Sequence, residues 1–141
     1  STPIKSSAAS DVYKRQPIPR DIPTGENISP ASLSIETEHD HYPLSTTEVK
    51  ITITNHSHYE YECGEKYSLA YYNKSKRQWE TLPTDPVVND ILWIFPPEHP
   101  SHQQTIKLYT SESPNHPGKY RIYKSFNRGT KVAYGEFELL P

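Results

Sequence analysis

Alternation of apolar and polar residues along the chain is the feature that most limits its fold. The clearest case is the segment 48–55, EVKITITN, in which Val49, Ile51 and Ile53 share one side and polar residues share the other. The segment 104–110 repeats the pattern, and no window shows the i, i+3, i+4, i+7 spacing of an amphipathic helix. A period of two is typical of half-buried strands, so the sequence predicts an all-β fold.

Polar and turn-forming residues separate these runs. Segments 67–72 and 77–82 flank the polar stretch 73–76 and predict a hairpin. Gly129, which can adopt a positive φ, lies in a second expected turn at 127–130. Roughly seven to nine short strands at intervals of about 8 to 12 residues are typical of an antiparallel β-sandwich or a small barrel.

The same alternation predicts which residues form the core, because inward positions recur at every second residue of a strand. The expected core residues are Leu33, Ile35, Val49, Ile51, Ile53, Leu69, Trp79, Ile106, Leu108, Tyr120, Ile122, Val132 and Phe137.

Length and composition exclude several classes of protein. The chain has 141 residues, enough for one domain with a modest core. No apolar run approaches the roughly 20 residues that a membrane-spanning helix needs. The formal net charge is −2 at pH 7, which excludes a generally basic nucleic-acid-binding protein. We therefore expect no nucleic-acid partner and no transmembrane segment in this sequence.

The first residues do not read as part of a natural domain. Segment 6–16, SSAASDVYKRQ, matches the translation of a transposase-type sequencing adapter, and the chain contains no methionine. We expect residues 1–16 to be a non-native, disordered leader, fused near Pro17 to a truncated gene. This interpretation leaves room for a lipid anchor or a further domain upstream in the natural protein.

The remaining sequence divides into two parts. Residues 17–31 are proline-rich and predict an extended linker, because proline fixes φ and lacks a backbone N–H. Residues 32–141 carry all the strand patterns and predict one β-sandwich domain.

Three ordered motifs resemble a known family. They are ITITNHS at 51–57, CGEKYSLAYY at 63–72 followed by Trp79, and PGKYRIYK at 117–124. Together they are similar to bacterial immunoglobulin-like domains of cell-envelope proteins, many of them lipoproteins. The resemblance covers residues 33–139 and implies an immunoglobulin-like β-sandwich in the cell envelope, either periplasmic or surface-exposed.

The sequence departs from the family at two points. Ala70 stands where the family usually has an acidic residue, and Pro96-Pro97 replaces a Pro-Gly turn. The second departure leaves the geometry of that connection open. The resemblance implies no catalytic activity.

Three residues suggest structural roles. Tyr120 follows Pro-Gly at the start of a late strand, the position of a tyrosine corner whose hydroxyl bonds the backbone upstream. An exposed, partner-binding tyrosine is the alternative. Gly118 belongs to the same turn, and Trp79 belongs to the second motif.

Metal or catalytic chemistry has little support in the sequence. The pairs His39/His41 and His56/His58 each offer two imidazole ligands, but all the histidines lie in expected loops. Cys63 is the only cysteine, at an expected strand end, where a buried thiol is the usual case. We expect no catalytic residues, no metal and no cofactor.

Basic residues gather near the last hairpin and suggest an interaction patch. With tyrosine between them, they would suit an acidic glycan or a protein partner. A solvated hairpin edge explains them equally well. The residues of this expected patch are Arg121, Tyr123, Lys124, Arg128 and Lys131, with Tyr134 beside them.

The sequence thus predicts a non-catalytic structural, adhesion or interaction module with an unidentified protein or glycan partner. A proteinase-inhibitor domain is one alternative and would present the loop 84–90. A carbohydrate-binding module is the other and would expose a row of coplanar aromatic rings. Candidates for that row are Tyr71, Trp93, Tyr109 and Tyr123.

Overall fold

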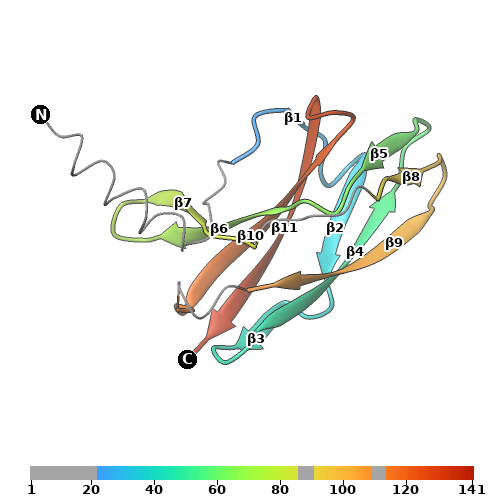
Figure 1. Ribbon diagram of the computed structural model, residues 1–141. Helices are drawn as coiled ribbons and strands as arrows, with labels where there is room; N and C mark the ends of the chain where they lie inside the picture. Colours follow the sequence, from blue (N-terminus) through green and yellow to red (C-terminus); the bar gives the residue numbers. More distant parts are fainter. Residues whose placement is uncertain (1–21, 86–90, 109–113) are drawn as a thin grey trace, which may run out of the picture.

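The computed structural model describes residues 22–85, 91–108 and 114–141 (Figure 1). The expected leader, 1–16, and the first part of the expected linker lie outside these ranges. Every regular element in the described ranges is a β-strand. The strands are β1 (Glu26–Asn27), β2 (Leu33–Thr37), β3 (His41–Pro43), β4 (Glu48–Asn55), β5 (Tyr61–Cys63), β6 (Ser68–Asn73), β7 (Gln78–Leu82), β8 (Trp93–Phe95), β9 (Ser101–Lys107), β10 (Gly118–Phe126) and β11 (Lys131–Leu140).

The strands form two packed layers, and the predicted β-sandwich is confirmed. One sheet has the order β1-β11-β10-β6-β7, with β3 also paired to β11. The second has the order β2-β4-β9, and a short ribbon pairs β5 with β8. Figure 1 shows β2, β4 and β9 lying across the long hairpin of β10 and β11. The eleven strands in the described ranges exceed the expected number because several are only two or three residues long.

The sandwich is not wholly antiparallel. Both β1 and β3 pair in parallel with the same edge of β11, at its two ends. Between them β2 crosses β11 closely: a Cβ on Gly135 would lie 2.4 Å from the carbonyl oxygen of Ile35. Only a glycine permits this approach of two backbones.

The core lies between the layers and contains nearly all the residues expected there. Their alternation along β2, β4, β9, β10 and β11 places them on inward faces, where they are buried. Two residues are exceptions: Val132 is buried on the opposite face of the larger sheet, and Leu82, not Trp79, points inward from β7. Trp79 is half-buried on the opposite face of that sheet.

Part of the expected linker belongs to the domain. The amides of Glu26 and Ile28 donate to the carbonyl oxygens of Thr130 and Val132, at 3.0 and 2.8 Å. The Ile28 side chain packs against the core. An apolar residue and an available strand edge therefore order this stretch despite its proline content. Residues 26–31 of the expected linker are thus part of the folded domain.

Candidate functional site

The structure separates the five residues of the expected basic patch. Along β10, Arg121 and Tyr123 face away from the core, whereas Lys124 faces into it. Arg128 lies in the β10–β11 turn with φ of 58° and is exposed. Lys131 begins β11 and forms an ion pair with Glu26 of β1. These residues do not form one basic surface.

Arg121 is the centre of a cluster on the outward face of the larger sheet. Its guanidinium lies between two rings, 4.1 Å from the ring centroid of Trp79 and 4.3 Å from that of Tyr134. Its Nε atom donates to Glu136 at 2.6 Å, and one terminal nitrogen donates to the hydroxyl of Tyr123 at 3.2 Å. We call Trp79, Arg121, Tyr123 and Tyr134 the outer-face cluster.

The outer-face cluster combines fixed geometry with partial exposure. Within the cluster Tyr123 is buried. The side chains of Trp79, Arg121 and Tyr134 are half-exposed. Burial opposes the charge of Arg121, but the hydrogen bonds that Arg121 donates to Tyr123 and Glu136 outweigh it, so the pKa of Arg121 is raised. The guanidinium is thus charged. Glu136 orients it and balances its charge in an ion pair.

Lys124, expected in the surface patch, lies instead in the core. Strand alternation places it on the same side as Ile122 and Phe126, and it has no exposed surface. Its ammonium donates to the carbonyl oxygen of Gly64 at 2.7 Å and to Oε1 of Gln104 at 2.8 Å. It therefore links β10 to the segment after β5 and to β9 in the facing sheet.

The surroundings of Lys124 lower its pKa. Burial lowers the pKa of Lys124 to about 8, although the negative fields of Cys63 and Glu65 partly oppose this. Burial also raises the pKa of the Cys63 thiol to about 11, with Lys124 acting in the opposite direction. A protonated, buried thiol is a poor nucleophile at neutral pH.

Tyr120 makes the contacts of a tyrosine corner. Its hydroxyl accepts a hydrogen bond from the amide of His116 at 2.9 Å and donates to the carbonyl oxygen of His116 at 3.1 Å. Its ring stacks on Phe137 with centroids 5.3 Å apart. Gly118 nearby has φ of +135°, and a Cβ there would meet the Tyr71 ring at 3.3 Å. These contacts fix the start of β10.

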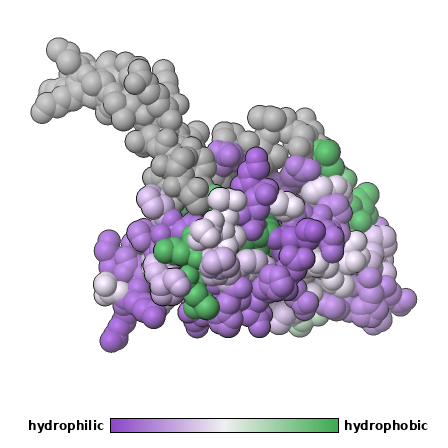
Figure 2. All heavy atoms as spheres, turned by 90° about the horizontal axis from the view of Figure 1, so that it is seen from below, coloured by the Kyte–Doolittle hydropathy of each residue, from purple (hydrophilic) through white to green (hydrophobic). Residues whose placement is uncertain are grey.

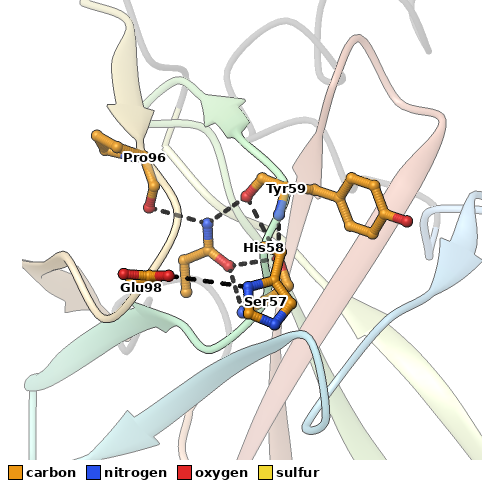
Figure 3. Close-up of polar contacts among 6 residues, drawn as sticks. Ser57, His58, Tyr59, Pro96 and Glu98 are labelled. Carbon is orange, nitrogen blue, oxygen red and sulfur yellow. Dashed lines mark hydrogen bonds and ion pairs between the residues drawn. The ribbon is translucent and has the colours of Figure 1, made fainter.

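Asn55 is a structural residue that the sequence reasoning missed, although it lies in the first motif. Its side chain is fully buried at the end of β4 and donates to the carbonyl oxygens of Tyr59, Phe95 and Pro96. It also accepts from the amide and hydroxyl of Ser57. Figure 3 shows how Ser57, Tyr59 and Pro96 converge on these contacts from two loops. An Asn followed by Ser two residues later is the signal for such a turn.

The histidines do not assemble a metal site in the described residues. No group of three His, Cys, Asp or Glu side chains in 22–85, 91–108 and 114–141 is arranged to hold a metal ion. His56 forms a hydrogen bond with the Ser34 hydroxyl at 2.8 Å, and His102 packs against Trp93 with the two rings tilted and their centroids 3.7 Å apart.

The aromatic row expected of a carbohydrate-binding module is not assembled in the described residues. Of the candidate aromatic row, Tyr71 packs on Tyr120, Trp93 packs on His102, and Tyr123 is buried. Tyr109 lies outside the described residues, as does most of the loop 84–90. The described aromatic candidates therefore do not form a coplanar exposed row.

A second surface feature lies at the β5–β8 end of the sandwich. The face in Figure 2 is mostly hydrophilic, with hydrophobic residues in only small areas. Against this background, Ile91, Leu92 and Ile94 are each about half exposed. Ile91 and Leu92 line a surface depression of about 550 Å³.

No described helix has the length and apolar character needed to cross a bilayer. No curated protein matches the sequence.

Comparison with solved structures and with family models gave matches. One solved structure that is similar is "Pseudomonas fluorescens alkylpurine DNA glycosylase AlkC bound to DNA containing an abasic site analog", with a TM-score of 0.41 and 13% identity. The match covers 79% of this chain and only 31% of that one. The family described as "Bacterial Ig-like domain" matches residues 29–138. The chain therefore belongs to the family of bacterial Ig-like domains.

Proposed function

We propose that this chain is a non-catalytic interaction module of a bacterial cell-envelope protein and that it binds a protein partner through the outer-face cluster. The observation that carries the proposal is the position of Arg121 between the rings of Trp79 and Tyr134 on an outward sheet face. Trp, Tyr and Arg are the residue types that dominate the binding energy of protein interfaces.

The fixed geometry of the cluster supports a binding role. Arg121 is held by two rings, a tyrosine hydroxyl and a carboxylate, so little side-chain entropy remains to be lost when a partner binds. Because the guanidinium covers the ring faces of Trp79 and Tyr134, these faces are less available to stack on sugars. This arrangement favours a protein partner over a glycan.

The envelope location rests on family membership and on the motifs of the sequence. Ig-like domains commonly serve as rigid, non-catalytic spacers or binding modules, and such folds are frequent in cell-surface proteins. Fractionation of the native bacterium, with an antibody against this domain, tests the location. We expect the domain in the envelope fraction, and recovery from the cytosol alone contradicts the location.

The binding proposal is tested on arrays of bacterial envelope proteins and of glycans. We expect the purified chain to bind protein spots and expect Trp79→Ala and Arg121→Ala to weaken that binding by about tenfold or more. Arg128→Ala is the matched control, because Arg128 is an exposed arginine outside the cluster. Binding to glycans alone, no binding to proteins, or equal protein binding by all variants contradicts the proposal. The same proteins are also assayed against a panel of proteases. If the wild-type chain and all variants inhibit a protease equally, the proteinase-inhibitor alternative is favoured.

A further inference from the structure

The strand β7, at one edge of the larger sheet, has a side that is not paired. One side of β7 pairs with β6, and no strand in the described ranges pairs with the other. Every residue of β7 is partly or fully exposed. Figure 1 shows the hairpin of β6 and β7 extending away from β2, β4 and β9. Because the residues of a strand direct their amides and carbonyls alternately to its two sides, β7 offers backbone donors and acceptors along this edge.

The residues of β7 do not block the addition of a strand. At the other side of the same sheet, the short strands β1 and β3 cover the edge of β11. In contrast, β7 contains neither lysine nor proline, the residues that commonly protect an edge. Its only charged residue, Glu80, is held within its own hairpin, 3.5 Å from Nζ of Lys76 and 3.1 Å from Nδ2 of Asn73. The edge is therefore suited to accept another strand.

The side chain of Trp79 favours an apolar residue in such a strand. Trp79 belongs to both β7 and the outer-face cluster, and its ring packs against Tyr72 with centroids 5.2 Å apart. It remains half-exposed at the margin of the sheet. Residues directly opposite each other in paired strands have Cβ atoms about 5 Å apart. An apolar side chain opposite Trp79 therefore covers the exposed part of the indole ring.

The turn between β6 and β7 favours acidic residues in the same strand. Lys74, Lys76 and Arg77 are exposed in this turn, and Glu80 forms an ion pair with Lys76 alone. Asp85 is exposed beyond the other end of β7, so the basic charge lies at the turn. A second copy of the chain fits this edge less well. Two antiparallel β7 strands in full register place Glu80 directly opposite Glu80, and like charges in that position destabilise a pair.

We propose that the protein partner of the outer-face cluster adds an extended strand to the unpaired edge of β7. The added strand carries an apolar side chain opposite Trp79 and acidic side chains beside the turn 74–77. Backbone hydrogen bonds supply affinity in this mode of binding, and the side chains supply specificity. The inference rests on the proposed function, because it specifies the form of the partner that binds there.

The first test uses synthetic peptides as probes. Each peptide alternates valine and threonine and carries glutamates at one end, at the N-terminus in one peptide and at the C-terminus in the other, so that both strand directions are sampled. We expect one of them to bind the isotope-labelled whole chain and to shift the β7 amides in NMR spectra. N-methylation of one alternate set of peptide amides removes the donors that face β7, and we expect it to weaken binding by about tenfold or more. N-methylation of the other set leaves binding intact.

The second test reverses a charge at the turn. We expect Lys74→Glu to weaken binding of the glutamate peptide by about threefold, as is typical of an exposed charge pair. The matched control is Lys50→Glu, which makes the same change at an exposed lysine of β4 and leaves binding unchanged. A peptide with lysines in place of the glutamates binds Lys74→Glu better than it binds the wild-type chain. Circular dichroism verifies that each variant is folded.

Three results overturn the inference. They are the failure of both glutamate peptides to bind, equal binding by the two N-methylated forms, and a dimer of the chain alone that the peptides dissociate.

Failure of this inference is distinguishable from failure of the proposed function. If a protein identified on the array depends on Trp79 and Arg121 but is not displaced by the peptide, strand addition is refuted and the proposed function stands. If the peptide binds β7 but no protein binds on the array, the proposed function alone is refuted.

Discussion

Replacing Lys124 with Met tests the buried cation that joins the two sheets. The pKa of Lys124 falls from 10.5 to about 8 because folding buries the ammonium. Below pH 8 the lysine is protonated in the folded and unfolded chains alike, and the folded chain bears the full cost of a buried charge. Between pH 8 and 10.5 only the unfolded chain keeps the proton, so the free energy of unfolding rises with pH.

The size of this rise follows from the same pKa values. One pKa unit corresponds to about 1.4 kcal/mol, so the full interval from pH 8 to 10.5 raises the free energy of unfolding by about 3 kcal/mol. Cys63 acts in the opposite sense, because its pKa rises from 9.0 to about 11 and its stabilisation is lost as pH increases through that range. The rise in the free energy of unfolding that Lys124 causes can therefore be measured separately only in a chain that lacks Cys63.

The assay is urea unfolding at a series of pH values from 7 to about 10.5, in Cys63→Ala and in Cys63→Ala with Lys124→Met. We expect stability to rise by about 3 kcal/mol in the first and to lack this rise in the second. Tyr120, whose pKa burial raises, is present in both proteins and cancels in the comparison. Identical pH profiles for the two proteins refute a desolvated Lys124. Stability at pH 7 alone is not informative, because losing the charge is offset by leaving two carbonyl oxygens without their donor.

Three further substitutions test contacts that define the fold. Gly135→Ala forces a Cβ to 2.4 Å from the carbonyl oxygen of Ile35, and we expect a loss of at least about 2 kcal/mol in urea unfolding. Tyr120→Phe removes both hydrogen bonds to His116, and we expect a loss of about 1–2 kcal/mol by the same measurement. Asn55→Ala removes the amide group that donates to three carbonyl oxygens and accepts from Ser57, and we expect a loss of at least about 2 kcal/mol, seen as a lower thermal midpoint.

Each of these substitutions has a matched control in the chain. Gly64→Ala adds a Cβ that meets only one backbone atom, at 3.4 Å. Tyr71→Phe removes an exposed hydroxyl that donates to Pro117. His58→Ala alters an exposed side chain of the loop that Asn55 organises. We expect each control to cost clearly less than its partner, and equal losses within a pair contradict the contact assigned there.

Much of the fold was predictable because alternation reports burial directly. Val49, Ile51 and Ile53 occupy every second position of β4, and all three are buried on the same face of that strand. The pairing of β1 and β3 with β11 was not predictable, because parallel contacts of two or three residues leave no periodic pattern. The role of Gly135 was not predictable either, because glycine is required there by the close approach of β2, which is distant in sequence.

The surface was harder to predict than the core. Grouping Lys124 with Arg121 relied on closeness in sequence, although the alternation of β10 already placed the two residues on opposite faces. The contact of Trp79 with Arg121 depends on the register of β7, β6 and β10, which the sequence does not encode locally. Asn55 was detectable in principle from its Asn-x-Ser pattern at the end of a strand.

The central claim, that the outer-face cluster is the binding surface, is tested most directly by NMR titration of the isotope-labelled chain with a protein identified on the array. We predict that the Trp79 indole N–H and the amides around Arg121 and Tyr134 shift together. We also predict that these shifts are lost in Arg121→Ala. Shifts confined to the β5–β8 ribbon or to the loops around Asn55, with Trp79 unaffected, contradict the account.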